Sequence, residues 1–240
     1  TTLGALKKTA YKPLSIQQEL ARNLRARMQK GKPTFEGLLG YENTVIPDVE
    51  RALLSGHSIN LLGLRGQAKT RLARQLSQLL NEWVPVVEGS EINDDPLAPI
   101  SNFAKALIAE NGEDTPVTWL HRNDRFFEKL ATPDVTVADI IGDVDPIKAA
   151  NLKLSYADDR VIHFGMIPRA NRCLFVINEL PDLQLFLQTA EIILYNLKSY
   201  DADLKIISSD LNFGNCYCVS PPLPFKPLDH SAPELFQVFA

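Results

Sequence analysis

Apolar residues recur along this chain with two alternating periods, a helical one and the short unbroken runs that are typical of buried strands. Expected helices cover residues 15–30, 45–55, 69–83, 102–109 and 188–200. Expected strands cover residues 58–62, 84–87, 161–164, 173–177 and 204–208. The pattern over 124–130 does not separate helix from strand. Strands that alternate with helices predict an α/β fold with a largely parallel sheet flanked by helices.

Composition places the chain among globular proteins. Its 240 residues are 45% hydrophobic and 22% charged, which suits one large domain with or without a short appendage. No run of about 18 apolar residues is present, so a membrane-spanning helix is not expected. The first four residues lack the apolar stretch of a secretory signal, and the odd cysteine count (Cys173, Cys216 and Cys218) argues against a disulfide framework. A cytoplasmic location is therefore expected.

Charge is distributed unevenly along the chain. Residues 1–35 carry eight Lys and Arg against Glu19 alone, which is +7; since the whole chain is −4, the other 205 residues sum to −11. This expected basic helical arm is either a solvated helix or a surface that contacts nucleic acid or an acidic neighbouring subunit. The acidic remainder argues against nucleic acid as the main ligand.

The stretch from Ser58 to Arg71 predicts a phosphate-binding loop. It reads S-I-N-L-L-G-L-R-G-Q-A-K-T-R, a strand that runs into a loop and then into a helix, and it is close to G-x-x-x-x-G-K-[ST]. The residues expected to bind the phosphates of ATP are Gly63, Gly66, Gln67, Ala68, Lys69, Thr70 and Arg71. Lys69 would also act in catalysis by reaching the β- and γ-phosphates, and the Thr70 hydroxyl would bind Mg²⁺. Ala68 replaces the second glycine: it fits if its backbone is helical and is strained if its φ is positive.

A second strand ends in polar residues about 110 positions later. Four apolar residues precede Asn178 and Glu179, so both are expected at the carboxyl edge of the sheet, where ligands bind in open α/β folds. Glu179 is predicted to polarise the water that attacks the γ-phosphate. Asn178 stands where an aspartate would hold Mg²⁺; it keeps the shape but not the charge, which predicts weaker metal binding.

Three ordered segments resemble MoxR-type and magnesium-chelatase-type AAA+ ATPases over about residues 36–184. The first is L-G-Y-E-N-T-V at 39–45, ahead of the phosphate loop. The second, at 130–142, is similar to the T-P-D…D-x-x-G segment of the family, and the third, at 162–172, is similar to the hairpin before its second nucleotide-binding strand. The resemblance implies an ATP- and Mg²⁺-dependent core for residues 36–184.

The resemblance also implies assembly and partners. It implies a homo-oligomeric ring that remodels an unidentified protein partner or assists metal insertion, with an arginine from a neighbouring subunit at the γ-phosphate. Gly40 and Tyr41 would lie beside the adenine. Arg160, Arg169 and Arg172 are the arginines at hand, each with a surface or structural role as the simpler interpretation.

The resemblance weakens over residues 185–240, which become proline-rich from about 219. Asn212 is a candidate sensor for the attacking water, at 33 residues from Glu179, and the helical lid of the family is expected to be absent from a chain that ends at Ala240. The segment around Asp210 and Asn212 also resembles a strand end of the endonuclease/exonuclease/phosphatase family. This C-terminal segment is thus either the remainder of the sheet or unrelated sequence.

Three functional hypotheses follow. The first is an ATP-hydrolysing AAA+ core. The second is a nucleotide-binding module with little or no hydrolysis, which Ala68, Asn178 and the missing lid motivate. The third is metal-dependent nuclease activity in the tail.

Overall fold

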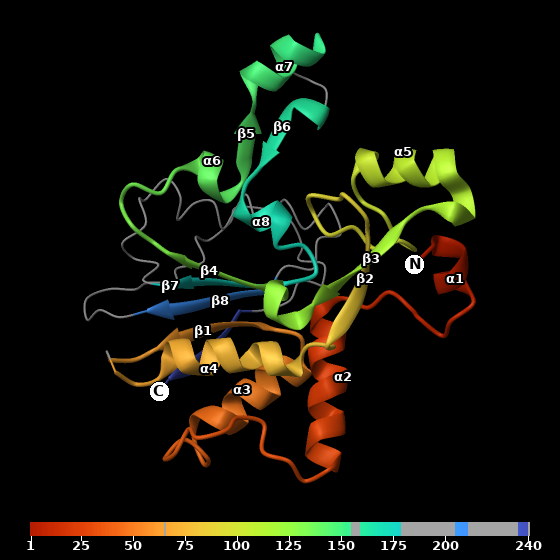
Figure 1. The fold of residues 1–240 in the computed structure, drawn as a ribbon. Coiled ribbons are helices and arrows are strands. Elements are labelled where there is room, and N and C mark those ends of the chain that lie inside the picture. The colour runs from red at the N-terminus through yellow and green to blue at the C-terminus, as the bar shows by residue number, and fades with distance from the viewer. Residues whose placement is uncertain (65, 155–158, 179–204, 211–234, 240) are drawn as a thin grey trace, which may run out of the picture.

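The computed structural model describes residues 1–64, 66–154, 159–178, 205–210 and 235–239 (Figure 1). Within them a five-stranded sheet has the order β4-β7-β8-β1-β9, and every neighbouring pair is parallel. Its strands are β1 (Ser58–Leu62), β4 (Phe126–Leu130), β7 (Leu174–Asn178), β8 (Lys205–Asp210) and β9 (Leu235–Phe239). The prediction of a parallel α/β sheet is confirmed for these strands.

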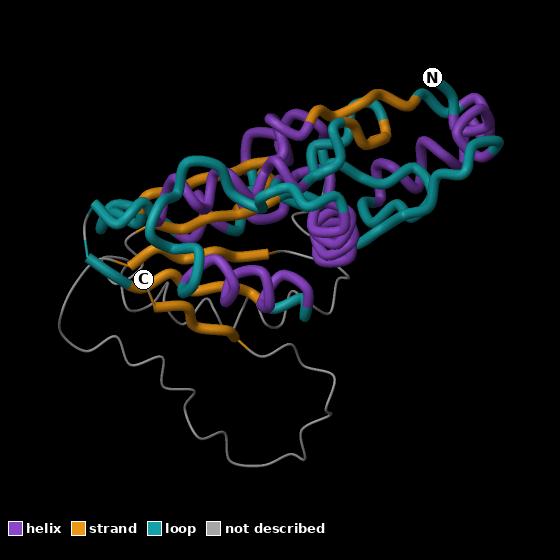
Figure 2. The backbone as a smooth tube through the Cα atoms, turned by 90° about the horizontal axis from the view of Figure 1, so that it is seen from below, coloured by secondary structure: helices purple, strands orange, loops and turns teal. Residues whose placement is uncertain are grey.

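Helices cover both faces of this sheet, and β7 shows why. Its apolar run is buried on both sides: Leu174 and Val176 join one hydrophobic cluster, whereas Phe175 and Ile177 join the other. The first cluster packs α2 (Ile16–Gln29), α3 (Val45–Leu54), α4 (Lys69–Gln75) and the 3₁₀ turn η1 (Leu76–Leu79). The second packs α6 (Val137–Ile140) and α8 (Met166–Arg169) on the opposite side (Figures 1 and 2). An unbroken apolar strand is what such a three-layer arrangement requires.

The basic N-terminal helix α2 is part of the folded core. The predicted capping box is present, with Ser15 and Gln18 each bonding the backbone of the other. Its apolar face is buried, and Glu19 forms a bidentate ion pair with Arg125, at 2.7 and 2.8 Å. The helix therefore contributes its one acid to a buried pair and its cations to the solvent-exposed face.

A separate antiparallel ribbon stands beside the main sheet (Figure 1). Strand β2 (Trp83–Val87) was expected from the sequence, but it pairs antiparallel with β3 (Val117–His121) and not with the parallel sheet. The chain start packs here, with the amide of Val117 donating to the Thr1 carbonyl at 2.7 Å. The other elements of this region are α1 (Leu3–Lys7), α5 (Asn102–Asn111), η2 (Gly112–Asp114) and η3 (Arg122–Arg125).

The helix after the phosphate loop is shorter than the sequence pattern predicts. The leucine period suggested a helix over 69–83, yet α4 ends at Gln75, η1 ends at Leu79, and Leu80 is extended with ψ 153°. The Ser77 hydroxyl donates to the Arg74 carbonyl at 2.8 Å, a local bond that competes with the regular helical ladder. The expectation of a helix to Trp83 is therefore wrong: α4 ends about two turns earlier, and Trp83 begins β2.

A hairpin with helices at its ends projects from the second face (Figure 1). It comprises β5 (Gly142–Val144), α7 (Pro146–Leu152), η4 (Asp159–Val161) and β6 (Ile162–Phe164). Gly142, the glycine of the T-P-D…D-x-x-G segment, has φ 119°, and a Cβ there would stand 2.3 Å from the His163 carbonyl. The glycine is thus required where the two hairpin strands approach.

The C-terminal strands extend the same sheet as the loop-bearing strand. β8 and β9 flank β1, with Leu62 opposite both Asp210 and Phe239. The five residues of β9 follow the final proline and are apolar except for Gln237, which suits a strand where the sequence indicated only an extended or irregular tail. The expected helix over 188–200 lies outside the described residues, as do Cys216 and Cys218.

Two further expectations are tested in part. No helix among the described residues is long and apolar enough to cross a membrane. Cys173 is a free, buried cysteine, and burial raises the pKa of its thiol to about 12, so it stays protonated near neutral pH.

Candidate phosphate-binding site

The loop that follows β1 lies where an α/β sheet binds ligands. After β1, the next strand of this sheet in the chain is β4, at the far edge. The chain then fills the positions between β4 and β1 with β7 and β8, and β9 is added on the other side of β1. The carboxyl end of β1 is therefore at a change of strand order, the position where open α/β sheets form a crevice. The residues that follow Leu62 enter that crevice and then open α4.

The backbone of the loop turns sharply at three positive-φ residues. These are Gly63 (φ 154°), Gly66 (φ 84°) and Ala68 (φ 57°, ψ 17°). A left-handed residue followed by a right-handed one, here Ala68 followed by helical Lys69, turns consecutive amides toward one side and forms an anion-binding concavity. Residue 65 lies outside the described part, and the remaining residues form a loop of the type that the motif predicts.

Ala68 is the strained position of the loop. The sequence left two possibilities, a helical alanine or a left-handed one, and the backbone angles show the left-handed one. A Cβ in this conformation costs about 1–2 kcal/mol relative to glycine. The loop shape is thus kept at a local cost that a glycine would avoid.

The Lys69 side chain folds back over the loop. Lys69 is 7% exposed, and its Nζ donates to the carbonyl of Gly63 at 2.7 Å and to that of Leu64 at 2.5 Å. These bonds hold the ammonium group across the residues that would surround a phosphate. The motif's cation is therefore at the loop, satisfied by carbonyl oxygens that an anionic ligand would have to replace.

Thr70 and Arg71 begin α4 with different surroundings. Thr70 is half-buried, and its hydroxyl makes no hydrogen bond with any described residue. Arg71 is exposed, and its guanidinium packs against Gly37, where a Cβ would stand 2.7 Å from Nη2. The two neighbours of Lys69 therefore contact different parts of the chain.

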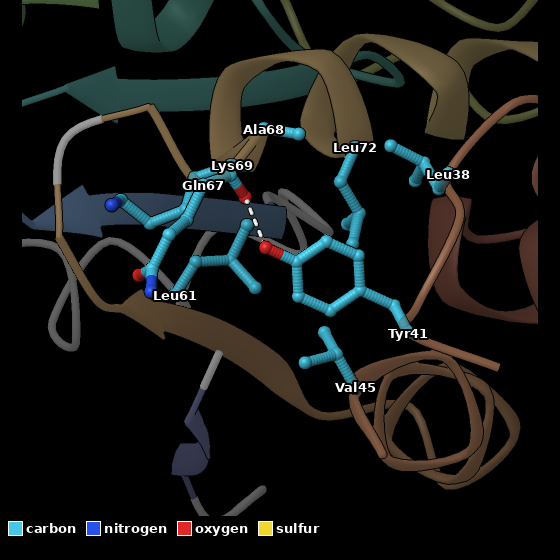
Figure 3. A pocket seen from close by; sticks show the side chains of 8 residues that line it. All are labelled: Leu38, Tyr41, Val45, Leu61, Gln67, Ala68, Lys69 and Leu72. Carbon is cyan, nitrogen blue, oxygen red and sulfur yellow. Dashed lines mark hydrogen bonds between the residues drawn. The ribbon is translucent and has the colours of Figure 1, made fainter. Parts of the chain in front are cut away.

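The segment expected beside the adenine does reach the loop. The Tyr41 hydroxyl donates to the Gln67 carbonyl at 3.1 Å, and Figure 3 shows the ring between Leu72, Leu61 and Val45. The same residues line a cavity of about 10 Å³, room for a single water-sized sphere. Its lining residues are Leu38, Tyr41, Val45, Leu61, Gln67, Ala68, Lys69 and Leu72. A purine base would have to displace Tyr41 to enter here; Gly40 beside it has φ 86°.

One buried polar atom of this region lacks a partner. The side-chain oxygen Oε1 of Gln67 is buried and accepts no hydrogen bond from any described residue. A buried acceptor of this kind is commonly satisfied by a ligand or an ordered water. The concave backbone and the Lys69 ammonium suit an anionic group, whereas the Gln67 oxygen suits a hydrogen-bond donor.

Asn178 ends β7 at the same edge of the sheet. One strand, β8, separates β7 from β1, so their ends are two strand spacings apart, about 10 Å. The Asn178 amide Nδ2 donates to Oε1 of Glu128 at 2.6 Å. Glu128 Oε2 also accepts from Nε of Arg74 at 2.9 Å, and Nη2 of Arg74 lies 2.8 Å from the same oxygen in an ion pair.

Sequence reasoning missed Glu128 and Arg74. Glu128 lies in the stretch whose period did not distinguish helix from strand, and only the pairing of β4 with β7 brings it beside Asn178. Arg74 had no signal beyond its place on α4, four residues after Thr70.

Two catalytic expectations lie outside the described residues, namely Glu179 and Asn212. Their neighbours are placed: Asn178 precedes Glu179, and Asp210 is two residues before Asn212. In the ladder Asn178 lies opposite Ser209, and Asp210 lies opposite Leu62. The ends of β7 and β8 therefore meet at the edge of the sheet where the loop begins.

Arg172 has a structural role. Its Nη2 bonds to Asp95 at 3.2 Å and to the Tyr11 hydroxyl at 3.0 Å, and its Nη1 donates to the Pro85 carbonyl at 2.8 Å. Burial raises the pKa of Tyr11, so its hydroxyl stays protonated and donates to Asp95. Because these contacts lie within one chain, Arg172 has a structural role and is not our candidate for the arginine that reaches a neighbouring subunit.

Within the described ranges no three His, Cys, Asp or Glu residues gather as a metal site. Mg²⁺ in nucleotide sites uses one or two protein ligands, with phosphates and water completing the octahedron. Thr70 and Asn178 remain the predicted ligands: Thr70 follows the loop directly, and Asn178 ends β7, two strand spacings from the end of β1.

Comparison with known proteins gives little beyond the geometry. No family model and no curated protein matches the chain. Among solved structures, one similar chain belongs to the complex between subunits BchI and BchD of magnesium chelatase. It is 18% identical with a TM-score of 0.46, and the match covers 71% of this chain and 50% of that one. This chain therefore spans about half of its length, and a likeness of this degree assigns neither a family nor an activity.

Proposed function

We propose that this chain is the nucleotide-binding core of an AAA+ ATPase that binds ATP with Mg²⁺ at residues 63–70. The observation that carries the proposal is the loop itself: positive-φ Gly66 and Ala68 lead into Lys69, whose ammonium lies over the loop at the carboxyl end of β1. The resemblance of residues 36–184 to MoxR-type and magnesium-chelatase-type ATPases supports the same conclusion.

In this proposal the loop amides and Lys69 bind the β- and γ-phosphates. Lys69 exchanges its bonds to the Gly63 and Leu64 carbonyls, in which only the donor is charged, for bonds to phosphate oxygens, in which both partners are charged. Thr70 and Asn178 would hold Mg²⁺, and the bound cation would neutralise charge on the phosphate oxygens. Tyr41 leaves its bond to the Gln67 carbonyl so that the base can enter between the segment at 40–41 and the loop.

Hydrolysis requires two residues at the neighbouring strand ends. Glu179 would polarise the attacking water, and Asn212 would hydrogen-bond that water or the γ-phosphate. The placement of Asn178 and Asp210 at the loop edge supports both roles, because each catalytic candidate follows one of them closely in the chain. An arginine from a second copy, assembled in a ring, would complete the charge stabilisation of the transition state.

The partner is proposed at the level of the family. Ring-forming AAA+ cores of this type remodel a protein partner or assist metal insertion, and we propose the same activity for this chain. Since a neighbour's arginine is needed for full turnover, hydrolysis should rise steeply with protein concentration.

A nucleotide-binding module with little hydrolysis is the alternative, and two observations favour it. Ala68 is strained in the loop, and Asn178 is an amide held by Glu128 where an acid is expected. Such a module would bind ATP and use it for assembly alone.

Glu179→Gln separates the two functions. For the ATPase, the unmodified chain releases phosphate from ATP in concentrated, Mg²⁺-containing solution, and Glu179→Gln binds ATP as tightly but loses turnover by about 10²-fold or more. Glu110→Gln, an exposed acid on α5, serves as the matched control. Phosphate release at background level in the unmodified chain, with nucleotide bound, would instead establish the binding module.

A further inference from the structure

The amide of Asn178 is held by a residue from the adjacent strand. Asn178 lies opposite Leu130 in the β4–β7 ladder, and Glu128 is two residues earlier on β4. Its carboxylate reaches forward to accept from Nδ2 of Asn178 at 2.6 Å. The contact therefore follows from strand pairing, and it ends at the carboxyl edge of the sheet.

The chemistry of the two groups fixes the direction of this bond. An ionised carboxylate can only accept, so the nitrogen end of the Asn178 amide has to face Glu128. The oxygen Oδ1, the one amide atom that can bind a cation, is then at the end away from Glu128. Glu128 thus decides which end of an otherwise reversible amide turns toward the rest of the edge.

Glu128 is itself held by the helix that opens at the phosphate loop. Arg74 bonds its other oxygen Oε2 through two nitrogens, at 2.8 and 2.9 Å, and Arg74 follows Thr70 by one helical turn. The Arg74 side chain is 64% exposed, so this ion pair adds little stability of its own. Its geometric effect is larger, because it connects Thr70's helix, Glu128 and Asn178 in one chain of bonds.

We propose that Glu128 is a positioning residue for the Mg²⁺ side of the site, which keeps Oδ1 of Asn178 directed toward the cation of the bound nucleotide. The inference rests on the proposed ATP-binding function. Neutral Asn178 and anionic Glu128 together replace a single carboxylate at position 178. An aspartate at 178 would stand against Glu128 as a second carboxylate, and two such groups in contact cannot both ionise at ordinary cost.

The proposal predicts a reciprocal pair of substitutions. Glu128→Gln presents an amide that can donate or accept, so Asn178 loses its fixed direction. Asn178→Asp alone brings two carboxylates together. The double variant Glu128→Gln with Asn178→Asp restores one hydrogen bond with its polarity reversed, since the Gln amide donates to the new carboxylate.

The experiment measures the dissociation constant for a non-hydrolysable ATP analogue with and without Mg²⁺, together with the melting temperature. The ratio of the two constants is the Mg²⁺ enhancement. We expect Glu128→Gln to lower it by about tenfold, and the double variant to recover it to within about threefold of the unmodified chain. Glu110→Gln, remote on α5, should leave it unchanged.

The outcomes distinguish the positioning role of Glu128 from the proposed ATP binding on which it rests. If the unmodified chain binds no nucleotide in either condition, the proposed function fails and this inference fails with it. If it binds with a Mg²⁺ enhancement that Glu128→Gln preserves, the inference alone is overturned. Equal weakening of both constants, with an unchanged ratio, would also overturn it, because that result marks a purely structural role. Should Glu128→Gln melt below the assay temperature, the double variant decides alone, and its failure to recover the enhancement counts against the proposal.

Discussion

Single residues in the loop balance shape against strain. Ala68 adopts the left-handed conformation that the second glycine of the motif normally takes, and Lys69 bonds to two carbonyls of the loop that it is expected to serve. The alanine shows that the loop geometry is imposed by its surroundings, because the residue itself disfavours it. Lys69 shows that the unliganded loop satisfies its own charge.

Replacing Ala68 by glycine should stabilise the chain. Removal of the Cβ relieves about 1–2 kcal/mol of backbone strain, and the greater freedom of glycine in the unfolded chain takes back about 0.4–1 kcal/mol. We expect a net gain of about 0.5–1 kcal/mol in the free energy of unfolding, measured by urea denaturation.

The control for this prediction is Ala106→Gly, the same change at an exposed helical position of α5. It should destabilise the chain by about 0.5–1 kcal/mol. Destabilisation of similar size by Ala68→Gly would contradict a left-handed strain at position 68.

Elements of the molecule are joined by a few buried polar contacts in addition to the apolar clusters. Helix α2 is attached through Glu19, which pairs with Arg125 and also accepts from the Asn81 amide at 2.6 Å. Arg125 donates in turn to the carbonyl of Arg172, just before β7. The basic helix is thus connected to the strand that ends in Asn178.

Replacing one partner of the Glu19–Arg125 pair should lower the free energy of unfolding more than replacing both. Arg125→Met leaves the Glu19 carboxylate buried without its partner, and we expect a loss of about 3–5 kcal/mol in unfolding free energy. The double change to Glu19→Leu and Arg125→Met should cost less than the single one. Arg25→Met, an exposed arginine of the same helix, should change stability by less than about 0.5 kcal/mol. A double variant as unstable as Arg125→Met would show that charge burial is not the cause.

The whole molecule also shows which features sequence patterns can reach. Apolar residues predicted β1, β7 and β8, and the run in β7 is unbroken because that strand is buried on both faces; the capping box at Ser15 predicted α2. The periodicity did not predict that β2 leaves the parallel sheet, because strand pairing depends on distant partners such as β3. It also placed the end of α4 about two turns too late, since the Ser77 bond is a local effect that the leucine period does not show.

The candidate site was predictable to a similar extent. The phosphate loop and the proximity of Tyr41 were read from motif and resemblance, and the structure brings the two together. The Glu128–Asn178 contact was not, because it arises from the register of two strands about 50 residues apart in the chain.

Titration of the chain with ATP and Mg²⁺ tests the central claim most directly. The account predicts saturable binding that Lys69→Ala weakens by about 10- to 100-fold, since charge-assisted bonds to phosphate are lost, while Lys105→Ala on α5 binds normally. Absence of binding by the unmodified chain, or equal affinity of Lys69→Ala, would contradict it.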